Sequence, residues 1–330
     1  MDSAAASRAP ARAAEGRLFF RRRRVFWLLP VLLLFLPPFL NQYQQYVVNT
    51  VLVYVLVGIG FNVVVGNLGL LAFSNVAYFG LGTYGSALLM AKLGWPWAAT
   101  VIPAGIIGAL AGVITSIPAV RGVRLFYLAI LTLAFGELMR WTYVHWESLT
   151  NGSMGMTVPS AAFPLDTDRH RFYVFLVLAI LAIVATDRLL RSRFGRAFEA
   201  IRGNEVAAAA MGIPTNRYIL LGFAWSGFIV GIGGAMFAIS VGQVSPPSFN
   251  MQELILEFAV VMVGGLGSLI GSVIGAAVLT ALPQIFISFP GFQELVFGVM
   301  IILVLLFLPR GLVSLLARLS PLFADRFYRE

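Results

Sequence analysis

The chain has 330 residues, of which 59% are hydrophobic and 11% are charged, and its 23 cationic residues outnumber its 14 acidic ones. Soluble domains carry about 25% charged residues, so this composition excludes a water-soluble globular protein and is typical of a multi-pass membrane protein. The absence of cysteine excludes disulfides and thiol chemistry, and the two histidines lack metal-ligand spacing, so no metal site is expected. Basic charge in such a protein sets topology more often than it binds nucleic acid, and no nucleic-acid partner is expected.

Apolar runs along the chain predict an all-α, polytopic transmembrane fold. A helix needs about 20 mostly apolar residues to cross a bilayer. Ten runs approach this length, and nine to eleven spans are compatible with the pattern: 25–40, 47–65, 76–93, 95–117, 125–143, 172–186, 219–241, 255–271, 272–288 and 294–308. The first run follows four arginines, as in a signal peptide, but no small-residue cleavage site follows it. We therefore expect an uncleaved first span.

The distribution of cationic residues predicts that both termini lie in the cytoplasm. With the N-terminus inside, the inner segments hold 19 Lys and Arg residues and the outer segments hold four, in agreement with the positive-inside rule. We therefore expect residues 1–24 to form a basic cytoplasmic tail, 25–308 the transmembrane domain, and 309–330 a second cytoplasmic tail. The Ala/Arg/Ser composition of the first tail favours disorder.

Glycines spaced four residues apart recur in the apolar runs, at 108 and 112, at 227 and 231, and at 267, 271 and 275. This spacing places small residues on one helix face, so that two helix backbones can approach closely. Two segments also share the form G-x-L-G-x-L, namely GNLGLL from Gly66 and GGLGSL from Gly264. Glycine-interrupted helices at corresponding places point to a transport site, because the break frees backbone groups to line a cavity. Ordinary tight hairpins would give the same pattern.

Charged residues inside apolar spans are costly and are candidates for function. Glu137 stands three residues before Arg140, which predicts an ion pair that is either structural or part of the wall of a polar path. Glu257 is expected near the outer end of its span. The residues expected along a translocation path are Gly66, Gly69, Ser74, Glu137, Gly264, Gly265 and Gly267.

Nucleotide-binding motifs are not supported. GLGTYG at Gly80 matches the dinucleotide fingerprint, but it lies in an apolar span without the strand and acidic residue that the fingerprint requires. The sequence has no G-x-x-x-x-G-K-[ST] phosphate loop and no group of nucleophile, base and orienting residue. We therefore predict that the chain is not an enzyme and binds no cofactor of its own.

A basic, alanine-rich segment at 187–218 interrupts two apolar runs. Phe194, Phe198 and Ile201 recur at helical spacing and predict one apolar stripe on a first short helix, which Gly203 ends. Such a helix could lie in a lipid interface or against protein.

A second short helix is predicted after the joint. Asn204 is a favourable N-cap, and Glu205 in the first turn suits the positive end of the helix. Gly212 suits a left-handed C-cap, and Pro214 prevents continuation. The alanine-rich helix is too weakly apolar for a good lipid anchor and fits a groove on a partner better.

Six motifs in chain order are similar to one family: GNLGLLAFSNVAYFGLGTYGSALL, RGVRLFYLAILTLAFGELMR, LTNGSMGM, FGRAFEAIRGNEVAAAAMGIPTNRYILLGFAWSGFIVGIGGAMFA, VMVGGLGSLIGSVIGAAVL and LPRGL. They resemble the membrane permease subunit of ABC importers for branched-chain amino acids, the LivH/LivM type, and its LivM branch in particular. The resemblance covers about residues 58–312. It implies a multi-pass protein of the bacterial inner membrane that translocates apolar amino acids by alternating access.

The resemblance also implies partners. These are a homologous second permease subunit, two cytoplasmic ATPase subunits that bind ATP and Mg²⁺, and a periplasmic substrate-binding protein. In this family a cytoplasmic loop docks on the ATPase, and the corresponding residues here are Phe194, Arg196, Phe198, Glu199, Ile201, Arg202, Asn204, Glu205 and Gly212. The loop's shared signature is Glu-Ala-Ala, three residues, then Gly. This chain departs from it, because Val206 follows Glu205 and Gly212 lies seven residues on.

Three alternatives stay open. The same kind of importer could carry urea or a short amide, since cargo choice rests largely on the binding protein. An ion-coupled secondary transporter would need titratable groups near the bilayer centre, for which Glu137 is the candidate. A non-transporting membrane scaffold would explain the packing glycines but not the jointed arm.

Overall fold

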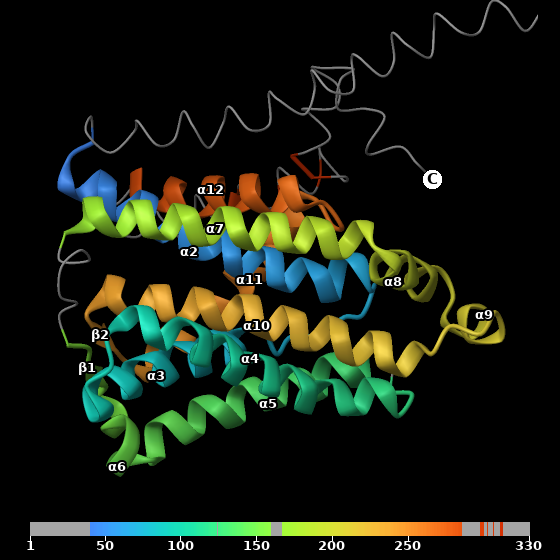
Figure 1. The fold of residues 1–330 in the computed structure, drawn as a ribbon, viewed down its shortest axis with the longest axis horizontal. Helices are drawn as coiled ribbons and strands as arrows, with labels where there is room; N and C mark the ends of the chain where they lie inside the picture. The colour runs from blue at the N-terminus through green and yellow to red at the C-terminus, as the bar shows by residue number, and fades with distance from the viewer. Residues whose placement is uncertain are drawn as a thin grey trace, which may run out of the picture.

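The computed structural model describes residues 40–123, 125–159 and 167–285, and beyond these only positions 298, 299, 302, 306, 311 and 312. The long helices lie side by side in an elongated bundle (Figure 1). Their order begins with α2 (Gln42–Asn62), η2 (Val63–Asn67), α3 (Asn75–Leu93), α4 (Trp97–Val120), α5 (Leu125–His145), α6 (Glu147–Thr150), η3 (Gly152–Met154) and β1 (Met156–Thr157). It continues with α7 (Asp168–Arg191), α8 (Arg193–Gly203), α9 (Glu205–Ala210), α10 (Thr215–Val241), β2 (Gln243–Val244), η4 (Pro246–Phe249), α11 (Met251–Gly264) and α12 (Leu269–Ile285).

Eight of the ten predicted spans correspond one for one to long helices in the described part of the chain. Of these, four are long and apolar enough to cross a membrane by themselves: Gln42–Asn67, Trp97–Val120, Asp168–Arg191 and Thr215–Val241. The first and last predicted spans, 25–40 and 294–308, and the two predicted tails fall outside the described residues apart from single positions.

The predicted span 255–271 is wrong in its extent. Helix α11 ends at Gly264, and α12 begins only at Leu269. Between them Gly265 and Gly267 have φ of 124° and 80°, a backbone conformation that helical residues do not adopt. The hydropathy of the run does not reveal this break, because its glycine and leucine residues are apolar whether the backbone is helical or not.

Glycines allow the central helices to pack at backbone distance. A Cβ built on Gly108 of α4 would lie 2.1 Å from the carbonyl oxygen of Gly227 in α10. A Cβ on Gly264 of α11 would lie 2.1 Å from the carbonyl oxygen of Gly271 in α12. Only a residue without a side chain fits at such contacts, so the predicted close packing is confirmed for the faces that carry Gly108, Gly227 and Gly271. Gly267 was predicted on the same face as Gly271, but it lies in the turn before α12, so that part of the prediction is wrong.

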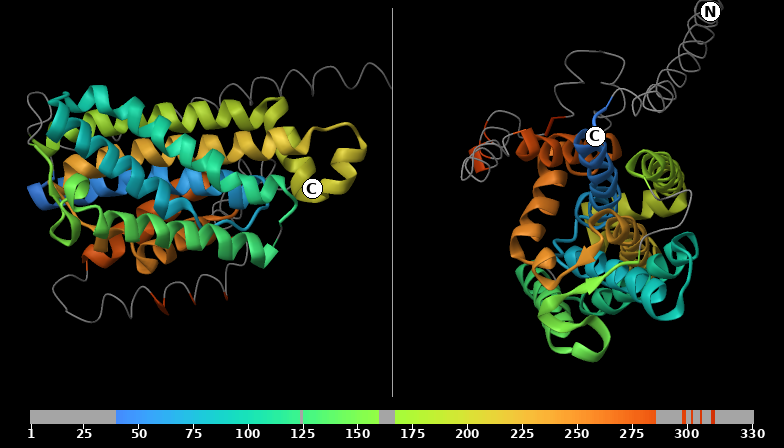
Figure 2. Two further views of the ribbon diagram at one scale, coloured as in Figure 1. Left: turned by 90° about the horizontal axis from the view of Figure 1, so that it is seen from below. Right: turned by 90° about the vertical axis from the view of Figure 1, so that its left-hand side faces the viewer.

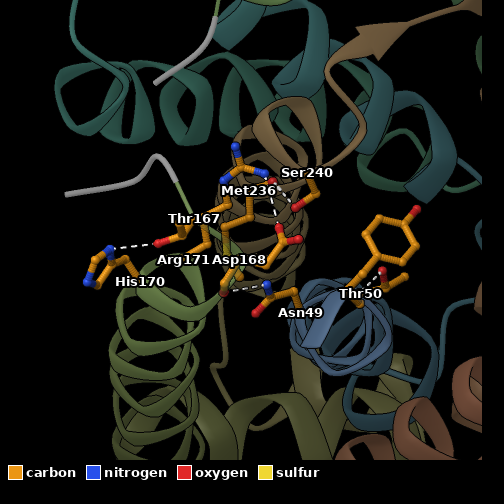
Figure 3. Close-up of polar contacts among 9 residues, drawn as sticks. Asn49, Thr50, Thr167, Asp168, His170, Arg171, Met236 and Ser240 are labelled. Carbon is orange, nitrogen blue, oxygen red and sulfur yellow. Dashed lines mark hydrogen bonds and ion pairs between the residues drawn. The ribbon is translucent and has the colours of Figure 1, made fainter. Parts of the chain in front are cut away.

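Helix α7 lies at the edge of the bundle and is attached by polar contacts near both of its ends. Near its start, Asn49 of α2 donates a hydrogen bond from Nδ2 to the carbonyl oxygen of Asp168 (2.9 Å), with Ser240 of α10 nearby (Figure 3). Near its other end, Trp225 of α10 donates from Nε1 to Thr186 Oγ1 (3.1 Å). These bonds satisfy polar groups that would be costly in an apolar environment.

The two ends of the bundle differ. One end carries α8, α9 and the α4–α5 connection, and the opposite end carries α6 and the two short strands (Figures 1 and 2). Strand β1 pairs antiparallel with β2, with Met156 opposite Val244, and so joins the α5–α7 connection to the α10–α11 connection. The arginines of residues 188–217 therefore gather at one end of the molecule, as the topology prediction requires.

Candidate functional site

Helix α8 is held against the bundle by its apolar stripe. Ser192 caps its start by accepting a hydrogen bond at Oγ from the Phe194 N–H (3.1 Å). Phe198 and Ile201 are 0% and 4% exposed, in a hydrophobic cluster with residues of η2, of the segment after η2 and of α10. Phe194 is half-buried and packs edge-on against Tyr218. The stripe is thus covered by protein rather than left open to lipid.

Arg196 and Glu199 face outward and are exposed, so the helix has one apolar and one charged side, as its sequence predicted. Arg202 is also exposed, but its side chain lies along the surface of the bundle next to Gly69 and Gly267.

Helix α9 has the cap residues that the sequence predicted. Asn204 Oδ1 accepts a hydrogen bond from the Ala207 N–H (3.0 Å), and Gly212 has a φ of 83° just after the helix. Val206 and Met211 are 80% and 84% exposed. The arm therefore ends in two uncovered apolar side chains on a short helix with a sharp joint before it.

The Asn204 cap is expected to determine whether α9 forms. A helix of six residues is marginal by itself and depends on its cap. Asn204→Ala should cost about 1 kcal/mol, which corresponds to about fivefold faster hydrogen exchange of the α9 amides if opening is local. Asn204→Asp keeps the acceptor and serves as the matched control. Equal exchange rates in the two variants would contradict this role of the cap.

The two G-x-L-G-x-L segments meet at the α8 end of the bundle. Asn62, fully buried in the last turn of α2, accepts a hydrogen bond at Oδ1 from the Gly267 N–H (2.8 Å). Its Nδ2 donates to the carbonyl oxygen of Ser268 (2.9 Å) and to Ser272 Oγ (2.8 Å). Gly66 packs so closely on this turn that a Cβ would lie 2.4 Å from the Gly267 nitrogen. Both segments thus form one interlocked junction.

Between η2 and α3 the chain is not helical. Leu68–Ser74 is irregular, and it starts with a positive φ at Gly69 (71°). Leu68, Leu70 and Ala72 are buried, and the Phe73 N–H donates to Thr132 Oγ1 of α5 (2.8 Å). Irregular backbone at membrane depth is tolerated only where protein buries it or where it lines a cavity.

Polar side chains gather where this segment ends. Ser74 Oγ donates to Tyr78 Oη (2.7 Å), which also contacts Thr115 Oγ1 of α4. Asn75 Nδ2 donates to Glu257 Oε2 (2.9 Å), while Asn75 Oδ1 and Glu257 Oε1 have no partner among the described residues. A narrow crevice, too small to hold a water molecule, adjoins this group and is lined by Phe61, Val64, Ala72, Ser74, Asn75, Tyr78, Phe223 and Ser226.

Glu257 corrects one expectation. It is the seventh residue of the 14-residue α11 and is completely buried, so its predicted position near the outer end of a span is wrong. The error follows from the wrong extent of the predicted span. The span was expected to end at residue 271, whereas α11 ends at Gly264, so Glu257 lies near the middle of the helix.

Glu137 and Arg140 form the predicted ion pair on α5, with 2.8 Å between Arg140 Nε and Glu137 Oε2. Their side chains are 44% and 41% exposed, and Glu137 does not line the crevice. Of the predicted path residues, only Ser74 lines the crevice. The five predicted glycines belong instead to the junction: Gly66, Gly69, Gly264, Gly265 and Gly267.

Sequence reasoning missed three polar residues of this region, Asn62, Asn75 and Tyr78. Two of them could have been found from the sequence, because Asn62 in GFNVVV and Asn75 in FSNVAY are isolated asparagines in apolar runs. A lone buried amide needs hydrogen-bond partners, and that requirement alone marks such positions as contacts between helices. In the described ranges there is no cluster of three His, Asp or Glu side chains that could hold a metal ion.

Comparison with known proteins gives a consistent result. The family model described as "Branched-chain amino acid transport system / permease component" matches residues 44–305. The high-affinity branched-chain amino acid transport system permease protein LivM of Salmonella typhimurium is 30% identical over 291 residues, which cover 80% of this chain and 68% of the relative. LivH of Escherichia coli is 27% identical over 79% of this chain and 91% of its own length. The autoinducer 2 import system permease protein LsrC of Klebsiella pneumoniae is 31% identical over 56% of this chain and 54% of its own. No solved structure matches the chain.

Proposed function

Since the chain belongs to the family of branched-chain amino acid transport permease components, which are transport subunits and not enzymes, we propose that it is the membrane-spanning permease subunit of an ABC importer for apolar amino acids in the bacterial inner membrane. In this proposal the cargo crosses by alternating access. The work comes from two cytoplasmic ATPases that bind ATP and Mg²⁺. A homologous second permease and a periplasmic substrate-binding protein complete the assembly.

The jointed arm carries this proposal. Its first helix is fixed to the bundle through buried Phe198 and Ile201, so a force on the arm reaches the bundle. Its tip presents Val206 and Met211, which are almost fully exposed. An apolar tip on an arm that is anchored in the bundle suits insertion into a hydrophobic groove of a partner. We propose that this partner is the ATPase, and that the end of the bundle with α8 and α9 faces the cytoplasm.

The face of α5 supports a path between two permease subunits. The Glu137–Arg140 pair is half exposed, about 18 Å along a helix that is about 31 Å long. A charged pair facing lipid at that depth would be costly. The same helix exposes Phe126, Tyr127 and Trp141. We propose that this face of α5 meets the second permease and a water-filled path rather than the bilayer.

The arrangement of spans is also part of the proposal. Eight long helices are described, and two further apolar runs at the ends of the sequence would bring the number of spans to ten. With the arginine-rich end inside, both termini are cytoplasmic.

An ion-coupled transporter remains the second candidate, and one observation favours it. Glu257 is a completely buried carboxylate, and one of its oxygens has no partner among the described residues, which is the kind of group that a proton or sodium ion could occupy. It replaces Glu137 as the titratable candidate for that mechanism, since Glu137 lies at the surface of the bundle.

Uptake by the assembled complex in proteoliposomes tests these functions. We expect labelled leucine, rather than urea, to accumulate only when ATP is present. Uptake of urea alone would identify the other cargo, and leucine uptake by the isolated subunit, driven by an ion gradient without ATP, would establish the second candidate.

The docking role of the arm is tested by Met211→Asp, which should reduce co-purification of the ATPases and ATP-driven uptake at least tenfold. Met154→Asp is the matched control for ATPase binding, because Met154 is 81% exposed and ends η3, between α6 and β1 at the opposite end of the bundle. Equal ATPase recovery in both variants would rule out docking at this tip.

A further inference from the structure

Arg202 lies where the arm meets both glycine turns. It stands in the last turn of α8. A Cβ built on Gly69 would lie 2.7 Å from Arg202 Cγ, and a Cβ on Gly267 would lie 3.0 Å from Arg202 Nη1. The aliphatic part of one side chain therefore covers the first turn, and its guanidinium group covers the second. Both glycines have positive φ, so the turns keep this surface free of side chains.

The charge of Arg202 suits this place. The π-helix η2 ends at Asn67, and α11 ends at Gly264, so the negative ends of two helices converge on the junction. A cation near a helix C-terminus is favoured by the helix dipole and by carbonyl groups that lack helical partners. The guanidinium thus has an electrostatic reason to stay with the turns when α8 moves, in addition to the contact of its aliphatic part.

The junction is connected to the interior of the bundle through two sets of contacts. Gly69 is the second residue of the irregular segment Leu68–Ser74, which ends beside the crevice. Gly267 is bonded to Asn62, which also holds Ser268 at the start of the α12 side of the turn. A displacement at the position of Arg202 therefore reaches the N-terminal end of α3 and the α11–α12 turn together.

We propose that Arg202 is the positioning residue that transmits movement of α8 to both glycine turns, and so couples ATP hydrolysis on the partner chains to opening of the transport path. This inference rests on the proposed function. It adds a specific route of transmission, in which the two glycines leave space for one arginine side chain to lie against both turns.

The first test measures the number of ATP molecules hydrolysed per leucine transported in the reconstituted complex. Arg202→Met keeps most of the aliphatic chain but removes the charge, and we expect uptake to fall about tenfold while ATP hydrolysis changes less than twofold. Arg202→Lys keeps the charge and should recover most of the uptake. A variant that loses hydrolysis and uptake in equal proportion, or that loses neither, would overturn the proposal. Failure of the unaltered complex to link uptake to ATP would instead refute the proposed function.

A second test does not depend on transport. The chain has no cysteine, so Gly203→Cys and Leu266→Cys give this subunit a single pair of spin labels, attached before it is assembled with its partners. Gly203 has open space for a side chain, and Leu266 is 42% exposed. With Arg202 present, the short-range spin–spin broadening should be the same before and after ATP addition to the complex, because α8 and the turn move together. With Arg202→Met the broadening should change on ATP addition, and an unchanged signal in that variant would contradict the proposal.

Discussion

Replacing Gly108 by leucine is expected to be among the most damaging single substitutions in the described part of the chain. Its Cβ would lie 2.1 Å from the Gly227 carbonyl oxygen and 3.1 Å from the Gly231 Cα. These are backbone atoms of α10, so no change of side-chain rotamer can relieve the overlap, and α4 must move away from α10. Overpacking of this kind costs about 3 kcal/mol or more.

The measurement is the midpoint of thermal unfolding of the purified protein in detergent. Gly108→Leu should lower it by about 10 °C or prevent purification altogether. Gly203→Leu is the matched control, because a Cβ at Gly203 meets nothing within 4 Å. An unfolding midpoint for Gly108→Leu within about 2 °C of the control would mean that the two helices do not pack as described.

Asn62→Leu is expected to loosen the glycine junction. The substitution keeps the branched shape of the side chain but removes three hydrogen bonds, to the Gly267 N–H, the Ser268 carbonyl and the Ser272 hydroxyl. Each buried polar group left without a partner costs about 1–3 kcal/mol. The Ser268 carbonyl keeps its hydrogen bonds from the Ser272 N–H (3.0 Å) and the Ser272 hydroxyl (3.3 Å), so the Gly267 N–H is the group left without a partner among the described residues. We expect a total loss of about 1–3 kcal/mol.

Asn67→Leu is the matched control for this prediction. Asn67 is in the same part of the chain, but its bond to the Gly267 carbonyl is long (3.4 Å) and its Oδ1 is without a partner in the described residues. The midpoint of thermal unfolding and the rate of ATP-driven uptake should both decrease much more for Asn62→Leu than for Asn67→Leu. Comparable losses of stability and uptake in the two variants would show that the hydrogen bonds of Asn62 do not hold the α11–α12 turn.

Local physics explains which features the sequence could predict. Hydropathy located the long helices because each must present apolar surface over most of its length. The caps of α9 were readable because Asn204 and Gly212 act on backbone groups within a few residues. Glycine spacing predicted close helix packing for a similar reason, since the spacing lies within one helix.

Features made by distant residues could not be predicted in this way. The hydrogen bond from Gly267 to Asn62 joins residues 205 positions apart, and that from Asn75 to Glu257 joins residues 182 positions apart. Periodicity carries no information about such pairs. The sequence indicated that both G-x-L-G-x-L segments matter, but it gave no reason to expect that they touch or that Arg202 would cover them.

The irregular segment Leu68–Ser74 also constrains how the chain can be inserted during its synthesis. Its backbone needs Thr132 of α5, and the residue after it, Asn75, needs Glu257 of α11. Neither partner has left the ribosome when this segment reaches the membrane. The start of α3 must therefore wait in a polar or protein-covered site, and the bundle can close around it only after α11 has entered the bilayer.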